Sequence, residues 1–205
     1  MLNFEDQFYN DNIKLIVGTD EAGRGPLAGP VFAAAVILPR NYHNELINDS
    51  KKLTEKRRIA AFHLIVNNAI AIGVGVVSAS EIDNINIYEA SRLAMQKAIE
   101  NMNHNYDLVV TDAMPFKKWK TEVIPIIKGD AKCECIAAAS IVAKVLRDNY
   151  MYTLAKKYPD YYFEKHKGYG TKLHMEALKK YGPIKGVHRE SYEPIKKLSN
   201  NRNKS

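Results

Sequence analysis

The chain has 205 residues, of which 46% are hydrophobic and 26% charged, as expected for a globular protein with one domain-sized core. A formal net charge of +7 favours a polyanionic partner, and no apolar run is long enough to span a membrane. The polar, acidic N-terminus argues against a signal peptide, and Cys133 and Cys135 are too few and too close for a disulfide framework or a zinc site, so we expect free thiols and a cytoplasmic location.

The first elements of the chain are predicted to be strands. Residues 1–13 are polar and are expected to form a flexible lead. The apolar run at residues 14–18 predicts a short buried strand, and residues 31–38, bounded by prolines, predict a second strand. Two adjacent carboxylates, Asp20 and Glu21, follow the point where the first strand is expected to end.

The stretch that joins these two strands restricts the chemistry. Asp20 and Glu21 repel each other and are costly to desolvate, and a hard divalent cation, Mg²⁺ or Mn²⁺, relieves both problems. Gly23 and Gly25 allow backbone N–H groups to approach a ligand closely, and Arg24 adds a cationic fork. A metal on one side and an anion cradle on the other suit a phosphodiester.

Three other interpretations of this stretch compete with a metal site. A phosphate-binding P-loop requires Lys and Ser/Thr where Arg24 and Gly25 stand. A dinucleotide fingerprint over Gly23, Gly25 and Ala28 must open a helix, and here a strand follows. A plain polar turn without a function also fits this stretch when it is taken alone. The other motifs of the chain favour the metal site.

Strands and helices alternate in the middle of the chain. Residues 55–68 carry a helical pattern, and residues 69–78 predict a third strand that completes a meander. Ser78 and Glu81 have the spacing of a capping box. We expect that box to start one long helix running to about residue 101.

Two further carboxylates follow predicted strands. Residues 107–112 predict a fourth strand, parallel to the first because a helix precedes it, so that Asp112 can lie beside Asp20. Residues 122–128 predict an edge strand because they contain a proline. Asp130 follows, near the start of a helix expected to run to about residue 157. An aspartate at either position is also a good turn or helix cap.

Polar and basic residues elsewhere are candidate phosphate contacts. They are Ser50, Lys51, Ser140, Lys144, Arg147, Lys165 and Lys167. For Lys144 and Arg147, which share one side of the predicted helix with Ser140, a solvated face is the simpler interpretation. Tyr169 stands between two glycines in a basic loop, where its ring could stack on a sugar or base.

The C-terminal part is predicted to be a small elaboration of one domain. Residues 172–181 predict a short helix, residues 188–192 a polar turn, and residues 196–205 a disordered tail. The expected organisation is therefore one catalytic domain over residues 14–195, with a helical C-terminal extension from about residue 158.

Four sequence motifs carry a resemblance to a known family. GTDEAGRGPLAGPV, DSKKL, KGDAKCECIAAASIVAKVLRD and HKGYGTKLH occur in this order, and together they closely resemble the type 2 ribonucleases H, specifically bacterial ribonuclease HII. The resemblance covers residues 16–192. It implies an α/β RNase H-like fold, with a central five-stranded mixed sheet flanked by helices and a helical C-terminal extension.

The resemblance also implies an activity and a partner. The family cleaves the RNA strand of RNA–DNA hybrids and incises on the 5′ side of ribonucleotides embedded in duplex DNA, which implies roles in ribonucleotide removal and RNA primer removal. The family uses Mg²⁺ or Mn²⁺, and the resemblance to it implies a monomer. The related HIII enzymes carry an extra N-terminal domain and end their acidic set with Glu, so Asp130 and the short lead favour HII.

Site residues follow from the resemblance position by position. The four acids fall on Asp20, Glu21, Asp112 and Asp130, the motif that senses the 2′-hydroxyl on Gly23, Arg24 and Gly25, and the junction-stacking tyrosine on Tyr169.

Two-metal chemistry would place Asp20 between both cations. Because neighbouring side chains of a strand point to opposite faces, we expect a bend or bulge at Asp20 and Glu21, or a Glu21 that acts through water.

Two other function classes stay open at the level of sequence. A nucleic-acid-binding protein without activity would share the basic surface, although an intact acidic set disfavours phosphate binding alone. Another metal nuclease of this fold, such as a resolvase, would cut DNA that contains no ribonucleotide.

Overall fold

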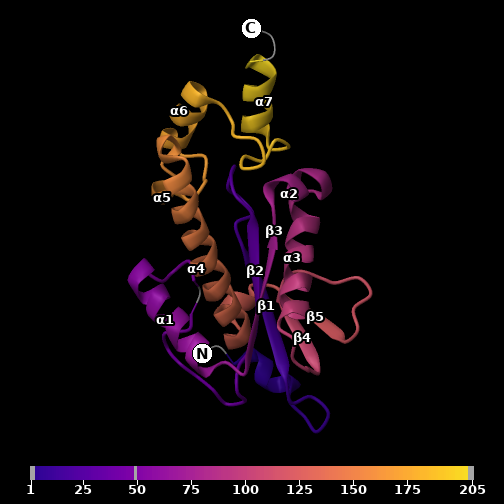
Figure 1. The fold of residues 1–205 in the computed structure, drawn as a ribbon. Helices are drawn as coiled ribbons and strands as arrows, with labels where there is room; N and C mark the ends of the chain where they lie inside the picture. The colour runs from indigo at the N-terminus through magenta and orange to yellow at the C-terminus, as the bar shows by residue number, and fades with distance from the viewer. Residues whose placement is uncertain (1–2, 49, 203–205) are drawn as a thin grey trace.

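A five-stranded sheet forms the centre of the molecule (Figure 1). The computed structural model describes residues 3–48 and 50–202. The strands are β1 (Ile16–Ala22), β2 (Val31–Ile37), β3 (Ala71–Val77), β4 (Leu108–Asp112) and β5 (Glu122–Ile126), in the spatial order β3-β2-β1-β4-β5. The first three form the expected antiparallel meander, and β4 and β5 add parallel to β1. The mixed sheet and the edge position of β5 are therefore confirmed.

Helices cover both faces of this sheet (Figure 1). They are α1 (Glu55–Asn68), α2 (Ala79–Ile85), α3 (Ile87–Asn101) and α4 (Glu134–Lys157). Strand β2 shows how the two cores arise: Ala33 and Ala35 pack in the core under α3, whereas Ala34 and Val36 pack in the core under α4 and α1. The strand is apolar throughout because both of its faces are buried.

Small residues let α3 approach the sheet closely. A Cβ atom built on Gly73 would lie 2.0 Å from the carbonyl oxygen of Ala98, and one on Gly75 would lie 2.0 Å from that of Ala94. No side chain fits in that space, so the close packing predicted for the two glycines is confirmed.

The prediction of one long helix after the capping box is wrong. The box itself forms, with the Ser78 and Glu81 side chains each bonding the other's backbone, but the chain breaks at Asn86, which has a φ of +66°. The Asn86 side chain accepts bonds from the amides of Tyr88 and Glu89 and so caps α3. Asparagine tolerates the left-handed region and caps helices well, and the break uses both properties.

The N-terminal segment, predicted to be a flexible lead, is packed against the domain. Phe4–Phe8 forms a 3-10 helix, η1. The buried Glu5 accepts a hydrogen bond of 3.0 Å from the backbone N–H of Cys135, at the start of α4. Phe8 and Tyr9 pack on the core that contains both cysteines, which are buried free thiols as expected. The polar composition concealed these few anchoring residues.

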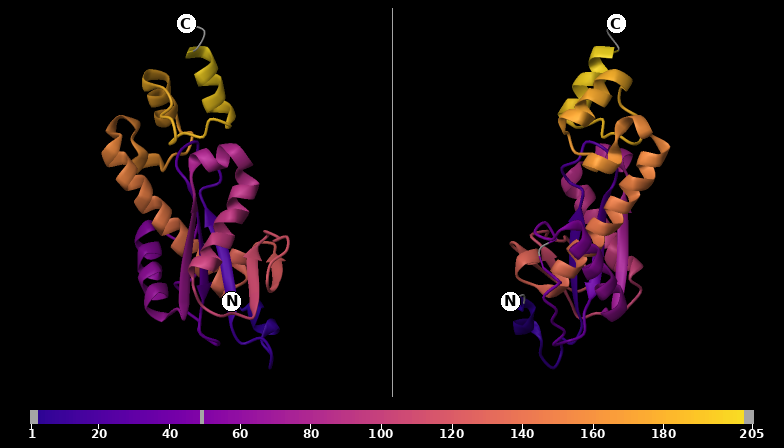
Figure 2. Two further views of the ribbon diagram at one scale, coloured as in Figure 1. Left: turned by 45° about the vertical axis from the view of Figure 1, so that its right-hand side comes forward. Right: turned by 90° about the vertical axis from the view of Figure 1, so that its left-hand side faces the viewer.

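The C-terminal extension lies at one end of the sheet (Figure 2). It comprises the 3-10 helix η3 (Pro159–Tyr161), α5 (Phe163–His166), α6 (Lys172–Tyr181) and α7 (Glu193–Arg202). The prediction of a disordered tail is wrong for residues 196–202, which belong to α7, and residues 203–205 lie outside the described residues. Ile195 is fully buried and Leu198 packs beside it, so two apolar side chains anchor a helix whose polar surroundings masked it. No helix in the described ranges is long and apolar enough to cross a membrane.

Replacing the buried anchor of α7 should destabilise the fold. We expect Ile195→Ala to lower the free energy of unfolding by about 2–4 kcal/mol, because it leaves a cavity in the C-terminal core. The exposed neighbour supplies a matched control, and Lys196→Ala should change the same quantity by about 0.5 kcal/mol or less. Urea unfolding of both variants measures this, and equal midpoints would show that α7 contributes nothing to stability.

Candidate active site

The two adjacent acids lie inside β1 rather than after its end. The parallel ladder between β1 and β4 ends at the pair Thr19 and Thr111, but the antiparallel ladder with β2 continues to Ala22. Asp20 is therefore the first residue beyond the parallel pairing, and Asp112 is the last residue of β4. The two carboxylates meet at the carboxyl end of neighbouring parallel strands, as predicted.

Three aspartates converge at this edge. One carboxylate oxygen each from Asp20, Asp112 and Asp130 lies within 4.8 Å of the other two. Asp130 belongs to the 3-10 helix η2 (Gly129–Ala131), which follows β5 and precedes α4. The backbone N–H of Gly129 donates to Asp112 at 2.8 Å, so the same short helix holds two of the three acids in place.

Burial and mutual repulsion make this cluster costly. Desolvation, and then the charges of Glu21 and Asp112, raise the pKa of Asp20 well above its usual range, against hydrogen bonds from Ser140 and from the Glu21 amide. Desolvation also raises the pKa of Asp112, and the Asp130 charge adds to the rise. Lys51 offsets part of the charge, with its Nζ 3.2 Å from Asp130, although that lysine is exposed and solvent weakens the pairing.

The donor set of this cluster fits a hard divalent cation. All three groups offer carboxylate oxygens, and no cysteine or histidine belongs to the group among the described residues. Oxygen donors alone suit Mg²⁺ or Mn²⁺ rather than zinc. A bound cation would also remove the repulsion that raises the pKa of Asp20 and Asp112.

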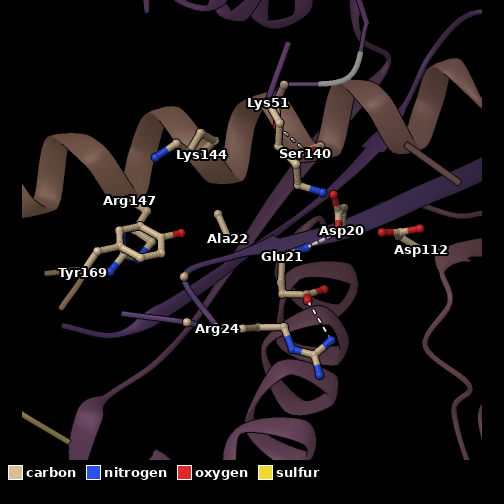
Figure 3. Close-up of a pocket in the computed structure, with 13 residues that line it drawn as sticks. Asp20, Glu21, Ala22, Arg24, Lys51, Asp112, Ser140, Lys144, Arg147 and Tyr169 are labelled. Atoms are coloured by element: carbon tan, nitrogen blue, oxygen red, sulfur yellow. Dashed lines mark hydrogen bonds and ion pairs between the residues drawn. The ribbon is translucent and has the colours of Figure 1, made fainter. Parts of the chain in front are cut away.

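Glu21 departs from the expected arrangement. The register with β2 continues without interruption from Asp20 to Ala22, so the bend or bulge predicted between the two acids is absent. Glu21 turns away from the aspartates toward Arg24, whose Nη1 lies 3.4 Å from its carboxylate (Figure 3). Alternation of side chains along a regular strand is the physical reason. The three-aspartate group does not include Glu21.

A cavity of about 330 Å³ adjoins the acids. Most of the residues predicted to contact substrate line it: Gly23, Arg24, Gly25, Ser50, Lys51, Ser140, Lys144 and Tyr169 (Figure 3). The Ser50 and Ser140 hydroxyls lie 2.9 Å apart and are buried, and Lys144 donates to Asp148 at 2.7 Å. The cavity thus has an acidic end and a basic end.

Two predicted phosphate contacts are not among the residues that line this cavity. The ammonium group of Lys167 lies 4.0 Å from the centre of the Tyr152 ring and donates to the Glu164 carbonyl. The ammonium group of Lys165 lies over the Tyr162 ring. The one-turn helix α5 takes up only the first part of the predicted basic loop, and Lys167 follows it as the C-cap in the left-handed conformation.

A buried arginine in the segment predicted to be a polar turn braces the glycine loop. Arg189 donates to the backbone carbonyls of Gly23 at 2.6 Å, Arg24 at 2.8 Å and Gly29 at 2.9 Å. It also donates to the Tyr192 hydroxyl, which itself donates to the Arg24 carbonyl at 2.6 Å. Arg189 is fully buried, and the fork geometry of its guanidinium fits several carbonyls at once.

Arg147 braces the same loop from α4, so the solvated face predicted for it is wrong. The side chain is 1% exposed, and it donates to the carbonyls of Ala28, Pro30 and Lys167. Desolvation, with a contribution from the charge of Arg189, lowers its pKa to about 10. Neither arginine forms an ion pair with any acidic side chain that the structure describes, so two buried positive charges lie behind the loop.

The loop conformation depends on the missing side chain of Gly23. This residue has a φ of +105°, and a Cβ atom there would lie 2.1 Å from Nε of Arg147. A Cβ on Gly25 would meet only the Tyr169 ring, at 3.4 Å. The first glycine is therefore required by the arginine brace, whereas the second leaves room above the backbone next to Tyr169.

Comparisons with known proteins agree with this geometry. The family profile described as Ribonuclease HII matches residues 17–195. Ribonuclease HII from Geobacillus sp. is 52% identical over 97% of this chain and 71% of that protein, and the Bacillus subtilis enzyme is 50% identical over 95% and 76%. The crystal structure of ribonuclease H2 from Pyrococcus horikoshii superposes with a TM-score of 0.79 and 26% identity, covering 93% of this chain and all of that one.

A side chain at the braced glycine should destabilise the protein. We expect Gly23→Ala to lower the free energy of unfolding by about 1–3 kcal/mol, because the new methyl group displaces Arg147 and the φ is unfavourable. In the matched control, Gly25→Ala should cost about 0.5 kcal/mol or less. Urea unfolding tests both, and equal losses would contradict the role assigned to Arg147.

Removing a charge from the aspartate cluster should stabilise the metal-free protein. The raised pKa of Asp20 means that its ionised form opposes folding. This effect is absent below the unfolded pKa, grows as pH rises from the unfolded pKa toward the folded pKa, and is complete above the folded pKa. Asp20→Asn should therefore raise the free energy of unfolding at pH 8 by on the order of 1 kcal/mol, with a smaller gain in acid.

The same variant should lose stabilisation by added metal. Mg²⁺ or Mn²⁺ should raise the melting temperature of the wild type by mass action and leave that of Asp20→Asn nearly unchanged. Thermal unfolding with and without each metal measures this. An equal shift in both proteins would place the metal elsewhere.

Proposed function

This chain belongs to the ribonuclease HII family, and on that premise we propose that it cuts duplex DNA on the 5′ side of an embedded ribonucleotide as well as the RNA strand of RNA–DNA hybrids. It is a ribonuclease H with endonuclease activity. The observation that carries the finer proposal is the three-aspartate cluster beside a braced glycine loop. The first suits hydrolysis of a phosphodiester, and the second suits recognition of a ribose.

The cofactor in this proposal is a divalent metal, Mg²⁺ or Mn²⁺, held by Asp20, Asp112 and Asp130. When bound, a pair of such cations supplies Lewis-acid chemistry that favours water as a nucleophile and a 3′ oxygen as leaving group, which yields 3′-hydroxyl and 5′-phosphate ends. Support comes from the all-oxygen donor set and from the raised pKa values of Asp20 and Asp112.

Glu21 has a separate part in this proposal. Its carboxylate lines the same cavity but pairs with Arg24, so it would reach the metal site through water, or directly once Arg24 turns to a substrate phosphate. Desolvation raises the pKa of Glu21 against the opposing effect of the Arg24 charge. Releasing Arg24 would therefore increase the benefit of a nearby cation.

Selection of a ribonucleotide requires a group that reads the 2′-hydroxyl, because this hydroxyl distinguishes RNA from DNA. We assign that role to the backbone groups of Gly23 and Gly25. Tyr169 lies next to Gly25 and is 46% exposed, and it is proposed to stack at the RNA–DNA junction. Lys51 and Lys144 would contact neighbouring phosphates, with the buried Ser50 and Ser140 supporting that wall.

One chain supplies every residue of this proposed site. The acids come from β1, β4 and η2, the loop follows β1, and Tyr169 belongs to the C-terminal extension. Because no second copy is needed to complete the cavity, we propose that the enzyme acts as a monomer on its nucleic-acid substrate.

A cleavage assay tests the proposed function directly. The substrate is a DNA duplex with one ribonucleotide, with Mg²⁺ or Mn²⁺, beside an all-DNA duplex of the same sequence. We expect incision on the 5′ side of the ribonucleotide, no cutting of the all-DNA duplex, and a loss of at least about 100-fold in rate for Asp20→Asn, because that variant removes a group on which the metal chemistry depends.

Each other outcome of this assay would indicate a different function or a different metal site. Binding of the duplex without incision in either metal would indicate a nucleic-acid-binding protein that retains the fold. Cutting of the all-DNA duplex would indicate a nuclease with different selectivity. Full activity of Asp20→Asn would remove this aspartate from the metal site.

A further inference from the structure

Three histidines are buried beneath the loop that carries Tyr169. They are His166 at the end of α5, His174 in α6, and His188 after α6. The rings of His166 and His174 are stacked, with centroids 4.4 Å apart, and those of His174 and His188 are 5.3 Å apart. None of them lines the cavity beside the aspartates.

The hydrogen bonds of this cluster determine where each proton is. The backbone N–H of Ile184 donates to Nδ1 of His188 at 2.8 Å, so a neutral His188 carries its proton on Nε2. That Nε2 lies 3.1 Å from Nε2 of His174, which must accept and must therefore carry its own proton on Nδ1. The Nδ1 of His174 lies 2.9 Å from the carbonyl oxygen of Tyr169. The bonds thus run in one direction, from Ile184 to Tyr169.

Hydrogen bonds also determine which nitrogen of the third histidine, His166, carries the proton. The backbone N–H of Gly168 donates to Nδ1 of His166 at 3.1 Å, and Nε2 of His166 lies 2.8 Å from the Tyr161 carbonyl oxygen. The amide of Tyr169 donates to the carbonyl of His166. The Tyr169 amide thus bonds the main chain of His166, and the Tyr169 carbonyl accepts from the Thr171 amide as well as from the His174 ring.

An extra proton would break this arrangement. A second proton on His188 would face the N–H of Ile184, and a second proton on His174 would face the N–H of His188. Burial, and the neighbouring rings, lower the pKa of His174 to about 4 and that of His188 to about 3. Both rings are neutral throughout the range in which the enzyme would work.

We propose that His174 and His188 are positioning residues for junction recognition, forming a hydrogen-bonded relay that fixes the backbone of Tyr169 and so the place of its ring beside Gly25. This inference rests on the proposed function for the role of Tyr169. Tyr169 lines the cavity and the histidines do not, so the relay can affect selectivity only through the position of Tyr169. The same loop segment is tied to the glycine loop, since the amide of Leu27 donates to the Gly168 carbonyl at 2.8 Å.

The first test is a double-mutant cycle on selectivity. The readout is the ratio of kcat/KM on a duplex with one ribonucleotide to kcat/KM on a continuous RNA–DNA hybrid. We expect Tyr169→Ala and His174→Leu each to lower this ratio by about 10-fold, as loss of one base-stacking contact would. The double variant should lose no more than Tyr169→Ala alone, because both changes remove the same contact.

Two control variants separate positioning from general damage. His174→Asn keeps an N–H donor close to the Nδ1 position, so it should retain the ratio within about threefold of wild type. His63→Leu makes the same chemical change on the exposed side of α1 and should leave the ratio unchanged. Because the readout is a ratio of two substrates, partial unfolding of His174→Leu lowers both values equally and does not imitate the expected result.

The second test needs no activity. Long-range ¹⁵N NMR of the imidazole rings should show His174 neutral and protonated on Nδ1, and His188 neutral and protonated on Nε2, at pH 7. The opposite tautomer at either ring would overturn the relay. Additive losses in the cycle, or a selectivity loss in His174→Leu with none in Tyr169→Ala, would overturn the positioning role. If the wild type fails to cut at a ribonucleotide, the proposed function fails, and the NMR result still decides the relay.

Discussion

Mutual repulsion among carboxylates at the end of the parallel pairing of β1 and β4 is the constraint on which the rest of this structure depends. Asp20 is buried in a regular strand, and the short helix η2 brings Asp130 to it from beyond β5. Such a cluster opposes folding. Burial of two apolar cores, one on each face of the sheet, offsets that cost. The sheet holds the acids close together, and a bound cation would relieve the repulsion between them.

The proposed selectivity depends on a second set of contacts with a different physical basis. Arg147 and Arg189 hold the glycine loop through backbone carbonyls alone, and neutral histidines hold the loop of Tyr169. Carbonyl partners do not neutralise the guanidinium charges, and Asp148 and Asp83 act on Arg147 and Arg189 only through space, without an ion pair. The two buried arginines therefore add positive potential beneath the glycine loop, on the side opposite a bound phosphodiester. Chemistry and recognition thus adjoin one cavity but depend on different elements of the fold.

How much of this could be read from the sequence differs from element to element. The strands and helices of the sheet follow from local periodicity, and α1 and α6 begin and end where the pattern predicts. The meeting of Asp20 and Asp112 follows from strand direction. In contrast, the break at Asn86 lies within a continuous helical pattern, and α7 is anchored by two apolar residues that no periodicity singles out. These features depend on tertiary contacts.

The candidate site shows the same division. Alternation of side chains along β1 directs Glu21 away from the aspartates. The sequence predicts either a bend or bulge at this point or a Glu21 that acts through water, and it does not decide between them. The burial of Arg147 and Arg189 and their contacts with the glycine loop were not predicted, because arginines are normally exposed and these contacts are with carbonyls far away in the chain.

The distance along the chain between the glycine loop and its brace has a consequence for synthesis. Arg189 and Gly23 are separated by 166 positions, whereas all three aspartates precede α4. As the chain leaves the ribosome, the strands that carry the acids can pair before the C-terminal extension has been made, and contacts of such long separation close late. With the roles proposed above, the groups for hydrolysis are therefore assembled before the groups that would restrict it to its substrate, and selectivity would be the last property that the growing chain acquires.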